Sequence, residues 1–346
     1  MRGVPAFGGS EAYLGCPSQR RTHRLDTFPA RRVPIQRMGV RRWAFFSSLV
    51  EDRLVKPSYV LITPARNEEM YIEETIRSVI SQTLLPKKWV IVSDGSTDRT
   101  DEIIRGYLSE YPWMELLRMP ERGDRHFAAK VQSFNAGYQN VAQLAFDVIG
   151  NLDADISFAP DYFDFLVTKF GELSDLGVAG TPFVEGATQV YDYRYTNIEH
   201  VSGACQLFRR KCFEDIGGYI PIRSGGVDWV AVTSARMKGW KTRTFTEKTC
   251  VHHRAIGTAG NSNLMVWFKY GRKDYFLGGH PLWELFRAVY QMSSRPYIIA
   301  GIFLLSGYSW AALTRVERPV SKELIQFHRK EQINRLHSFF RRRGRH

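Results

Sequence analysis

The sequence predicts an α/β fold, a mostly parallel sheet with helices on both faces, followed by a C-terminal helical segment. Short apolar runs alternate with amphipathic helical patterns from Tyr59 to Leu152, which is typical of parallel α/β proteins. The runs are apolar at nearly every position, as expected for strands that are buried on both faces. A length of 346 residues with 44% hydrophobic residues excludes wholesale disorder and leaves room for one large domain or two small ones.

The elements follow one another as strand and helix in strict alternation. The expected strands cover residues 59–63, 89–93, 114–119 and 146–152. The expected helices run from Glu68–Glu69 to about 82, from about 98 to 110 and from about 128 to 140. After Trp283 the pattern is helical again. We expect the core domain to cover residues 56–275 and the helical segment to cover 276–346.

The positive charge of the chain lies at its two ends. The formal net charge is +13, yet residues 1–45 hold nine Arg and two acids, and residues 315–346 hold ten Lys or Arg and three acids. A nucleic-acid-binding protein usually carries its charge on the folded domain, so we expect no nucleic-acid partner. Basic segments beside an apolar stretch favour an anionic membrane surface. We interpret residues 1–55 as a disordered basic extension, with Met38 as an alternative start.

An uncharged run of 19 residues, Pro296–Thr314, is at the lower limit for a membrane span. It has three interpretations: a helix packed on its own domain, a helix lying in the membrane interface, or a single transmembrane span. The mean hydropathy of −0.29 excludes a polytopic membrane protein. Four scattered cysteines indicate a reducing compartment and no structural zinc site. We therefore expect a cytoplasmic protein held peripherally on the inner face of the plasma membrane.

Two acidic residues, Asp153 and Asp155, end the last strand of the alternating region. In an extended segment positions i and i+2 point to the same side, so the two carboxylates converge. They lie beyond the carboxyl end of a strand, where open α/β sheets bind ligands. No basic neighbour in sequence relieves their repulsion. Hard oxygen ligands of this kind suit Mg²⁺ or Mn²⁺.

Polar loops follow the first two strands as well. After the second strand, Gly95 turns the chain and the residues at 96–98 cap the next helix, which leaves Asp94 at the strand end unexplained. After the first strand, Glu68 and Glu69 either favour a helix N-terminus or face the same sheet edge as Asp94.

Taken together, these loops resemble the family 2 glycosyltransferases with the GT-A fold, of the bacterial, non-processive type that builds cell-envelope polysaccharides. The resemblance rests on Pro64-Ala-Arg-Asn-Glu-Glu69, Asp94-Gly-Ser-Thr-Asp98, Leu152-Asp-Ala-Asp155 and Gly203-Ala-Cys-Gln-Leu-Phe-Arg-Arg210 with Ile216-Gly-Gly-Tyr219. It covers about residues 57–255. It implies a metal-dependent enzyme that moves one sugar from a nucleotide-sugar donor to an acceptor hydroxyl with inversion. The basic ends of the chain and the apolar stretch at 296–314 suggest a lipid-linked acceptor.

The resemblance also implies roles for single residues. Asp153 and Asp155 correspond to the two acids that hold Mn²⁺ or Mg²⁺ on the donor diphosphate, and a late histidine, His252 or His253, completes the metal shell. Because neighbours in a strand point to opposite faces, only one of the two histidines is expected to reach the metal. The residues that correspond to the donor nucleotide site are Pro64, Ala65, Arg66, Glu68, Asp94, Lys130 and Asp153.

The catalytic base of inverting members is often the Asp of a Glu-Asp pair that opens a helix. Here the matching stretch is Gly225-Gly-Val-Asp-Trp229, in which Asp228 supplies the Asp and Val227 replaces the Glu. Asp228 is thus the candidate base. Trp229 either stacks on a sugar or packs inside the protein, and Lys130 either touches phosphate or is a solvated helix residue.

Other readings are weaker. A processive polysaccharide synthase would carry a Q-x-x-R-W motif and several spanning helices, whereas the only Arg-Trp pair, Arg42-Trp43, precedes the domain. The first loop lacks the Gly-rich, Arg-containing pattern of nucleotidyltransferases and the G-x-G-x-x-G of dinucleotide oxidoreductases. A catalytically inactive membrane scaffold of the same fold remains as an alternative, since the base motif is half kept.

Overall fold

The computed structural model of the chain describes residues 56–121, 127–185, 188–189, 198–223, 225–254, 263–293 and 297–343. The chain divides into two compact units, Met1–Arg53 and Leu54–His346, and everything described lies in the second. The expected basic extension at residues 1–55 lies outside the described residues.

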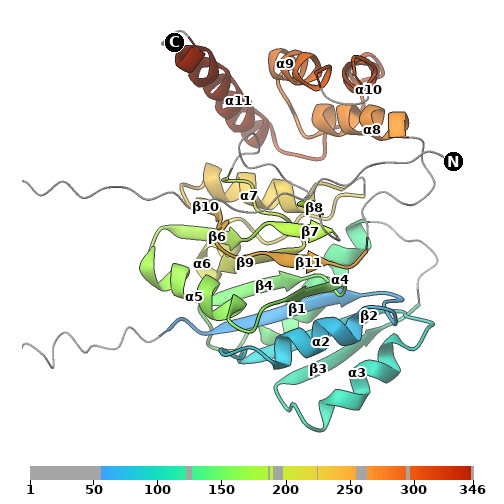
Figure 1. The fold of residues 1–346 in the computed structure, drawn as a ribbon, viewed down its shortest axis with the longest axis vertical. Coiled ribbons are helices and arrows are strands. Elements are labelled where there is room, and N and C mark those ends of the chain that lie inside the picture. Colours follow the sequence, from blue (N-terminus) through green and yellow to red (C-terminus); the bar gives the residue numbers. More distant parts are fainter. Residues whose placement is uncertain are drawn as a thin grey trace, which may run out of the picture. The chain divides into compact units, whose positions relative to one another are not determined.

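A seven-stranded sheet forms the centre of the second unit, in the order β10-β6-β9-β4-β1-β2-β3 (Figure 1). All neighbouring pairs are parallel except the two that involve β9, which runs antiparallel to both β4 and β6. The mostly parallel α/β fold expected from the sequence is therefore confirmed. The strands are β1 (Tyr59–Ala65), β2 (Lys88–Asp94), β3 (Met114–Met119), β4 (Val148–Leu152), β6 (Leu176–Gly180), β9 (Cys205–Arg209) and β10 (Lys241–Thr244).

Alternate residues of each central strand enter two different cores. In β1, Tyr59 and Leu61 belong to one buried cluster, whereas Val60 and Ile62 belong to the other, as the period of two along a strand requires. The first cluster is covered by α2 (Ile72–Ile80), α3 (Thr100–Leu108) and α5 (Tyr162–Glu172). The second is covered by α4 (Phe127–Val141), α6 (Arg210–Asp215) and α7 (Val227–Met237). Figure 1 shows α2 in front of the sheet and α4 behind it.

The first helix begins later than its acidic residues suggested. Glu68 and Glu69 lie in the loop before α2 because the chain turns at Asn67, which has a positive φ of 55°. This loop is bonded to the loop after β2: the side-chain oxygen of Asn67 accepts from the Thr97 amide at 2.9 Å, and the Ser96 hydroxyl accepts from the Asn67 amide at 3.2 Å. The helix starts only where these contacts end.

A second sheet of four short strands, β5-β11-β7-β8, lies beyond the carboxyl end of β4 (Figure 1). Its strands are β5 (Ile156–Phe158), β7 (Phe183–Glu185), β8 (Thr188–Gln189) and β11 (Cys250–His252). The antiparallel register of β11 and β5 sets His252 opposite Ile156. This pairing, which the sequence analysis did not predict, brings a residue from the end of the core domain next to Asp155.

The C-terminal helices are α8 (Asn263–Phe276), α9 (Pro281–Gln291), α10 (Ile299–Leu313) and α11 (Lys322–Arg343). Phe276 of α8 and Leu324 of α11 share an apolar cluster with Val230 of α7. The helical part begins at α8, before the boundary expected at residue 276. The apolar run forms α10, which buries one face with Leu304 and Tyr308 and exposes Ile302 and Leu313. Among the described helices, none has the length and apolar character needed to cross a membrane.

Candidate functional site

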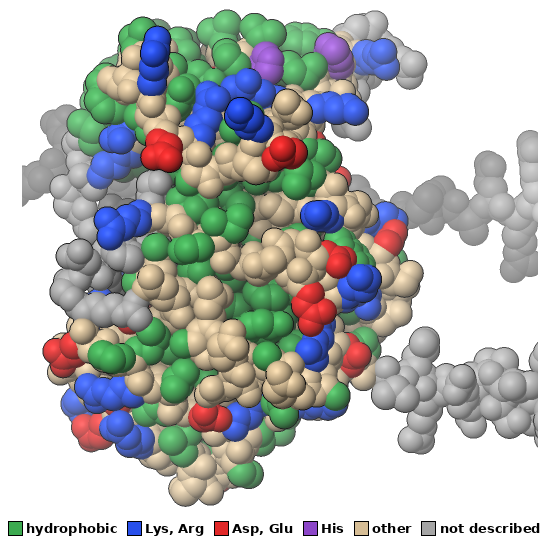
Figure 2. Space-filling view, turned by 180° about the vertical axis from the view of Figure 1, so that it is seen from behind, with side chains coloured by type: hydrophobic (Ala, Val, Ile, Leu, Met, Phe, Trp, Pro, Cys, Tyr) green, Lys and Arg blue, Asp and Glu red, His purple; other side chains and the backbone are tan. Residues whose placement is uncertain are grey.

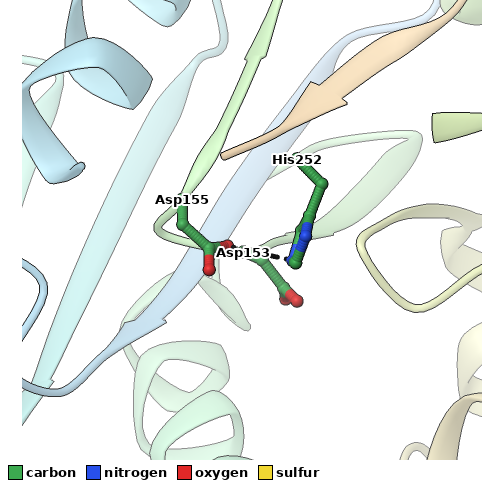
Figure 3. A group of neighbouring side chains, drawn as sticks. All are labelled: Asp153, Asp155 and His252. Atoms are coloured by element: carbon green, nitrogen blue, oxygen red, sulfur yellow. Dashed lines mark ion pairs between the residues drawn. The ribbon is translucent and has the colours of Figure 1, made fainter. Parts of the chain in front are cut away.

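Three side chains converge beyond the carboxyl end of β4. Asp153 and Asp155 come from the turn between β4 and β5, and His252 comes from the end of β11 (Figure 3). Each offers one ligand atom, and these atoms all lie within 4.8 Å of one another. His252 Nε2 is 3.6 Å from Asp155 Oδ1, and its Nδ1 is 3.5 Å from a carboxylate oxygen of Glu185. Two carboxylates and an imidazole form a donor set that suits Mn²⁺ or Mg²⁺.

Distant parts of the chain supply basic neighbours to these acids, contrary to what the local sequence suggested. Lys130 Nζ of α4 donates to Asp153 Oδ1 at 2.5 Å, so Lys130 is not a solvated helix residue. Arg254 Nε lies 3.6 Å from Asp155 Oδ2, and its other end donates to Glu68. The repulsion between the two aspartates is thus partly balanced by Lys130 and Arg254. A cation bound at this site would be attracted by the carboxylates and repelled by these two side chains.

The charges of the cluster shift each other's protonation. Burial raises the pKa of the Asp153 carboxyl, and the charge of Asp155 adds to the rise while that of Lys130 opposes it. Burial works to lower the pKa of Lys130, but the facing carboxylates of Asp153, Asp155 and Asp228 outweigh it and raise the value. The Lys130 ammonium therefore stays charged beside the cluster.

The two adjacent histidines point to different surroundings. His253 lies outside the three-residue group: its Nε2 is 2.8 Å from the Ser157 hydroxyl and 3.0 Å from a carboxylate oxygen of Glu74. Its ring also stacks on Tyr71, with centroids 6.2 Å apart. Of the two candidates, the structure brings His252 to the aspartates, and it gives His253 a contact with α2.

The loops after β1 and β2 lie side by side at the same sheet edge. Pro64 and Ala65 end β1, and the Arg66 guanidinium is 3.9 Å from Asp94 Oδ2 at the end of β2. The Glu68 amide donates to the Thr100 hydroxyl at 2.7 Å, which ties this loop to the start of α3. The residues expected around a nucleotide from the two loops are therefore neighbours, and Glu68 joins them to the acidic cluster through Arg254.

A cavity of about 290 Å³ adjoins the cluster and also reaches Asp228. Asp228 lies in the first turn of α7, where the helix N-terminus stabilises a negative charge. A Cβ atom at Gly203 would lie 2.9 Å from the Cβ of Asp228, so only glycine leaves room there. The cavity is lined by Lys130, Val131, Phe134, Asn151, Asp153, Phe183, Ser202, Gly203, Ala204, Tyr219, Gly225, Gly226, Val227, Asp228, His252 and Lys273.

Some residues of the site could not be found by sequence reasoning. Arg254 follows the histidine pair directly, but its contact with Glu68 depends on the pairing of β11 with β5. Lys273 reaches the cavity from α8, which follows the residues covered by the resemblance. Trp229, which the sequence offered for sugar stacking, packs instead against His328 of α11 with ring centroids 4.4 Å apart.

The chain has an α/β fold of the GT-A class, with the site beyond the carboxyl end of the central strands. A mannosyltransferase from Pyrobaculum calidifontis, solved in complex with GDP-Man and Mn²⁺, aligns over 81% of both chains with a TM-score of 0.50 and 17% identity. At this identity the likeness shows the fold alone.

Comparison of the sequence with known families gives a more specific result than comparison of the fold. Residues 60–217 match the model of glycosyl transferase family 2. The poly-beta-1,6-N-acetyl-D-glucosamine synthase of Staphylococcus epidermidis is 24% identical over 55% of this chain and 47% of that protein. The hyaluronan synthase of Pasteurella multocida is 29% identical over 35% of this chain and 12% of that protein. The chain spans less than half the length of either curated relative.

Proposed function

We propose that the protein is a metal-dependent glycosyltransferase that moves one sugar from a nucleotide-sugar donor to an acceptor hydroxyl, with inversion at the anomeric carbon. One observation carries the proposal: Asp153 and His252 of the acidic cluster line the same cavity as Asp228. A donor diphosphate near the cluster and an acceptor near Asp228 would meet in that space. The match of residues 60–217 to the family 2 model and the likeness to the fold of a mannosyltransferase support the same interpretation.

Each side of the cavity has its own task in this proposal. Asp153, Asp155 and His252 would hold the divalent cation, which when bound neutralises charge on the departing nucleoside diphosphate. Arg66, Glu68 and Asp94 would contact the nucleotide, with Pro64 and Ala65 shaping the loop. Lys130 would stay on the cluster side through its contact with Asp153.

Asp228 would act as the base on the acceptor side. Its carboxylate takes the proton of the acceptor hydroxyl as that oxygen bonds to the anomeric carbon and the bond to the donor phosphate breaks. It lies in the first turn of α7, and Gly203 lets the chain approach it closely. Attack from the side opposite the leaving group inverts the anomeric centre.

A processive synthase is the second candidate, because the curated relatives are named as synthases. Single transfer is favoured by the missing Q-x-x-R-W motif and agrees with the described helices, none of which is able to span a membrane. Product length separates the two: a single-addition enzyme extends an acceptor by one sugar even with excess donor, whereas a synthase makes a ladder of products.

Peripheral attachment to an anionic membrane belongs to the same proposal. Large apolar side chains are exposed on α9 and α10, and Figure 2 shows hydrophobic side chains gathered at the end of the unit where these helices lie. Between Pro281 and Arg315 the sequence has a single acid, Glu284, which is 1% exposed. An apolar face without exposed negative charge suits the surface of an anionic bilayer and agrees with a lipid-linked acceptor.

The donor site is tested by thermal unfolding with UDP, GDP, CDP and dTDP, with and without Mn²⁺. A ligand at 100 times its dissociation constant stabilises the folded state by about 2.7 kcal/mol, which is a rise in Tm of a few degrees at this size. We expect one nucleotide to stabilise the wild type only with Mn²⁺, and the effect to be lost in Asp153→Asn. The control is Asp175→Asn, whose exposed carboxylate pairs with Lys241 at 2.6 Å outside the cavity.

Asp228→Asn separates binding from chemistry. It should keep the metal-dependent rise in Tm and lose sugar transfer, because the base is removed and the cluster is intact. If no nucleotide stabilises the wild type, the donor site is wrong and the inactive scaffold is the better reading.

A further inference from the structure

A cationic side chain of the C-terminal helices reaches the cavity that contains Asp228. Lys273 of α8 lines this cavity together with Gly226 and Asp228. Gly226 has a positive φ of 89°, and a Cβ atom there would lie 3.2 Å from Lys273 Cε. The lysine therefore lies against the loop that begins α7, on the side of the cavity that holds the proposed base.

Lys273 differs from the other cations near the cavity in its ion pairing. The other lysine of the cavity, Lys130, is paired with Asp153, and Asp274, the next residue of α8, is paired with Arg287 of α9. Across the described ranges, Lys273 itself has no ion-pair partner, and its side chain is only half-buried. A partly desolvated ammonium gains free energy when an anion replaces its lost water.

Lys273 is also held in place by the packing of its helix. A Cβ at Gly271 of α8 would lie 1.9 Å from the Leu304 carbonyl oxygen, and a Cβ at Gly307 of α10 would lie 2.0 Å from that of Phe268. The two helix backbones thus touch at glycines, which fixes α8 against α10. Ile302 and Leu313 of α10 are exposed, so the layer that carries Lys273 also carries part of the exposed apolar face.

The location of Lys273 assigns its ligand to the acceptor. In the proposed reaction the donor diphosphate lies at the cluster of Asp153, Asp155 and His252, where Lys130 is already present. The reacting hydroxyl of the acceptor must lie within hydrogen-bond reach of Asp228. Lys273 lies on the same side of the cavity as Asp228 and Gly226. An anionic group that binds Lys273 is therefore part of the acceptor molecule.

We propose that Lys273 is an acceptor-binding residue and that the acceptor carries a phosphate group close to the oxygen that receives the sugar. This inference rests on the proposed glycosyltransferase function and adds the chemical class of the acceptor. Such a phosphate belongs either to a lipid phosphate, which the exposed face of α9 and α10 would deliver from a membrane, or to a soluble sugar phosphate. Both sources share the group that Lys273 recognises.

The test is a calorimetric titration of the full chain, with Mn²⁺ and the stabilising nucleoside diphosphate present. The probes are decyl phosphate below its micelle concentration, glucose 6-phosphate, and decyl glucoside as a neutral control. The variants are Lys273→Gln, Lys273→Arg and Lys330→Gln, which removes an exposed charge from α11. A hydrogen bond to a charged group is worth enough to change affinity about tenfold or more.

We expect at least one phosphate probe to bind the wild type, and Lys273→Gln to weaken it about tenfold while Lys273→Arg and Lys330→Gln stay close to wild type. Tighter binding of decyl phosphate than of glucose 6-phosphate identifies the lipid source, and the reverse order identifies the soluble one. The inference is overturned if neither phosphate probe binds, or if Lys273→Gln binds them as the wild type does. It is also overturned if this variant loses the nucleotide instead. Nucleotide binding is measured in every sample, so loss of the donor site in the wild type is recognised separately.

Discussion

Gly203 lies so close to Asp228 that a Cβ atom at residue 203 would be only 2.9 Å from the Asp228 Cβ. Gly203 precedes β9, and its carbonyl oxygen accepts from the Asn151 side chain of β4 at 2.8 Å. This contact holds the loop against the sheet, so the loop has little freedom to move away from α7. The position of the Asp228 carboxylate therefore depends on a missing side chain at residue 203.

Gly203→Ala should reduce sugar transfer with little effect on nucleotide binding. The added Cβ would lie 2.9 Å from the Asp228 Cβ and 3.3 Å from its Oδ2, so the carboxylate must shift by a few tenths of an ångström. Because a misplaced catalytic group can cost about 100-fold in rate, we expect kcat to fall about 10- to 100-fold. The measurement is kcat with saturating donor.

A double-mutant cycle shows whether the effect acts through the base. In the Asp228→Asn background, Gly203→Ala should cost little more, since the group that it displaces is already inactive. Additive losses in the double variant would mean that Gly203 acts elsewhere. Gly106→Ala is the control, because no atom lies within 4 Å of a Cβ at that position of α3.

Sequence patterns place the residues at strand ends, but they do not by themselves place residues that tertiary packing brings to the site. Asp153 and Asp94 could be predicted because parallel strands end at a common edge. The choice between His252 and His253 depends on the register of β11 against β5, which three-residue strands do not specify by pattern. Arg254 and Lys273 left no signal, since an isolated cation is common on any surface.

The same limit holds at the scale of the elements. The long strands and helices of the first half could be predicted because their apolar residues repeat at clear periods, and β3 has the predicted bounds 114–119. The start of α2 was wrong because side-chain contacts between two loops, such as those of Asn67, decide where the helix begins. The short strands of the second sheet are too brief to show any period.

Helix α9 carries a buried acid whose protonation links its packing to pH. Glu284 is 1% exposed and lies 3.6 Å from Arg287, which also pairs with Asp274 of α8. Burial raises the pKa of Glu284 to about 8, with the charge of Asp274 adding to the rise and that of Arg287 opposing it. Two carboxyl groups thus share one guanidinium between α8 and α9.

This arrangement predicts that stability declines as the pH rises. A carboxyl group with a raised pKa in the folded state is protonated there and ionised in the unfolded state, so its contribution is full below the unfolded pKa, about 4.3. That contribution is lost progressively as the pH rises to about 8. The Glu284→Gln variant lacks this pH-dependent loss of stability. The difference between its Tm and the wild-type Tm should therefore increase from pH 5 to pH 9.

The exposed acid Glu247, in the loop between β10 and β11, provides the control. Glu247→Gln should follow the wild-type profile. Parallel pH profiles for Glu284→Gln and wild type would show that the buried carboxyl does not titrate in this range. The profile is read by thermal unfolding followed by circular dichroism.

At the scale of the whole molecule, the candidate site and the exposed apolar residues lie in two different regions of the second unit. The sheet and its edge hold the acidic cluster, and the C-terminal helices hold most of the exposed apolar surface. On α9 and α10 the exposed side chains are Leu282, Leu285, Val289, Tyr290, Ile299, Ile302, Trp310 and Leu313. Tyr and Trp suit a bilayer interface because their rings are apolar with one polar atom. The cation of Arg272 lies 4.9 Å from the Trp310 ring, so positive charge borders this face.

If this face binds lipid, acidic substitutions on it should release the protein from vesicles without unfolding it. Val289→Asp with Ile302→Asp changes two side chains that are 58% and 48% exposed. We expect the wild-type full chain to co-sediment with vesicles that contain anionic lipid. The double variant should bind at least about tenfold more weakly, since it loses two buried apolar side chains and adds two repelled charges.

The control pair Leu85→Asp with Leu144→Asp makes the same chemical change at apolar residues that are 45% and 40% exposed in loops of the core domain. Because these loops lie outside the C-terminal helices, the control should bind vesicles like the wild type.

Raising the salt to about 0.5 M weakens attraction between surface charges and leaves apolar insertion intact. If the α9–α10 variant binds vesicles as well as the wild type does, and both are released by high salt, attachment depends on the basic ends of the chain alone. Loss in the α9–α10 variant together with partial salt resistance in the wild type would show that the helices enter the bilayer interface, which places the cavity beside Lys273 within reach of a membrane-borne acceptor.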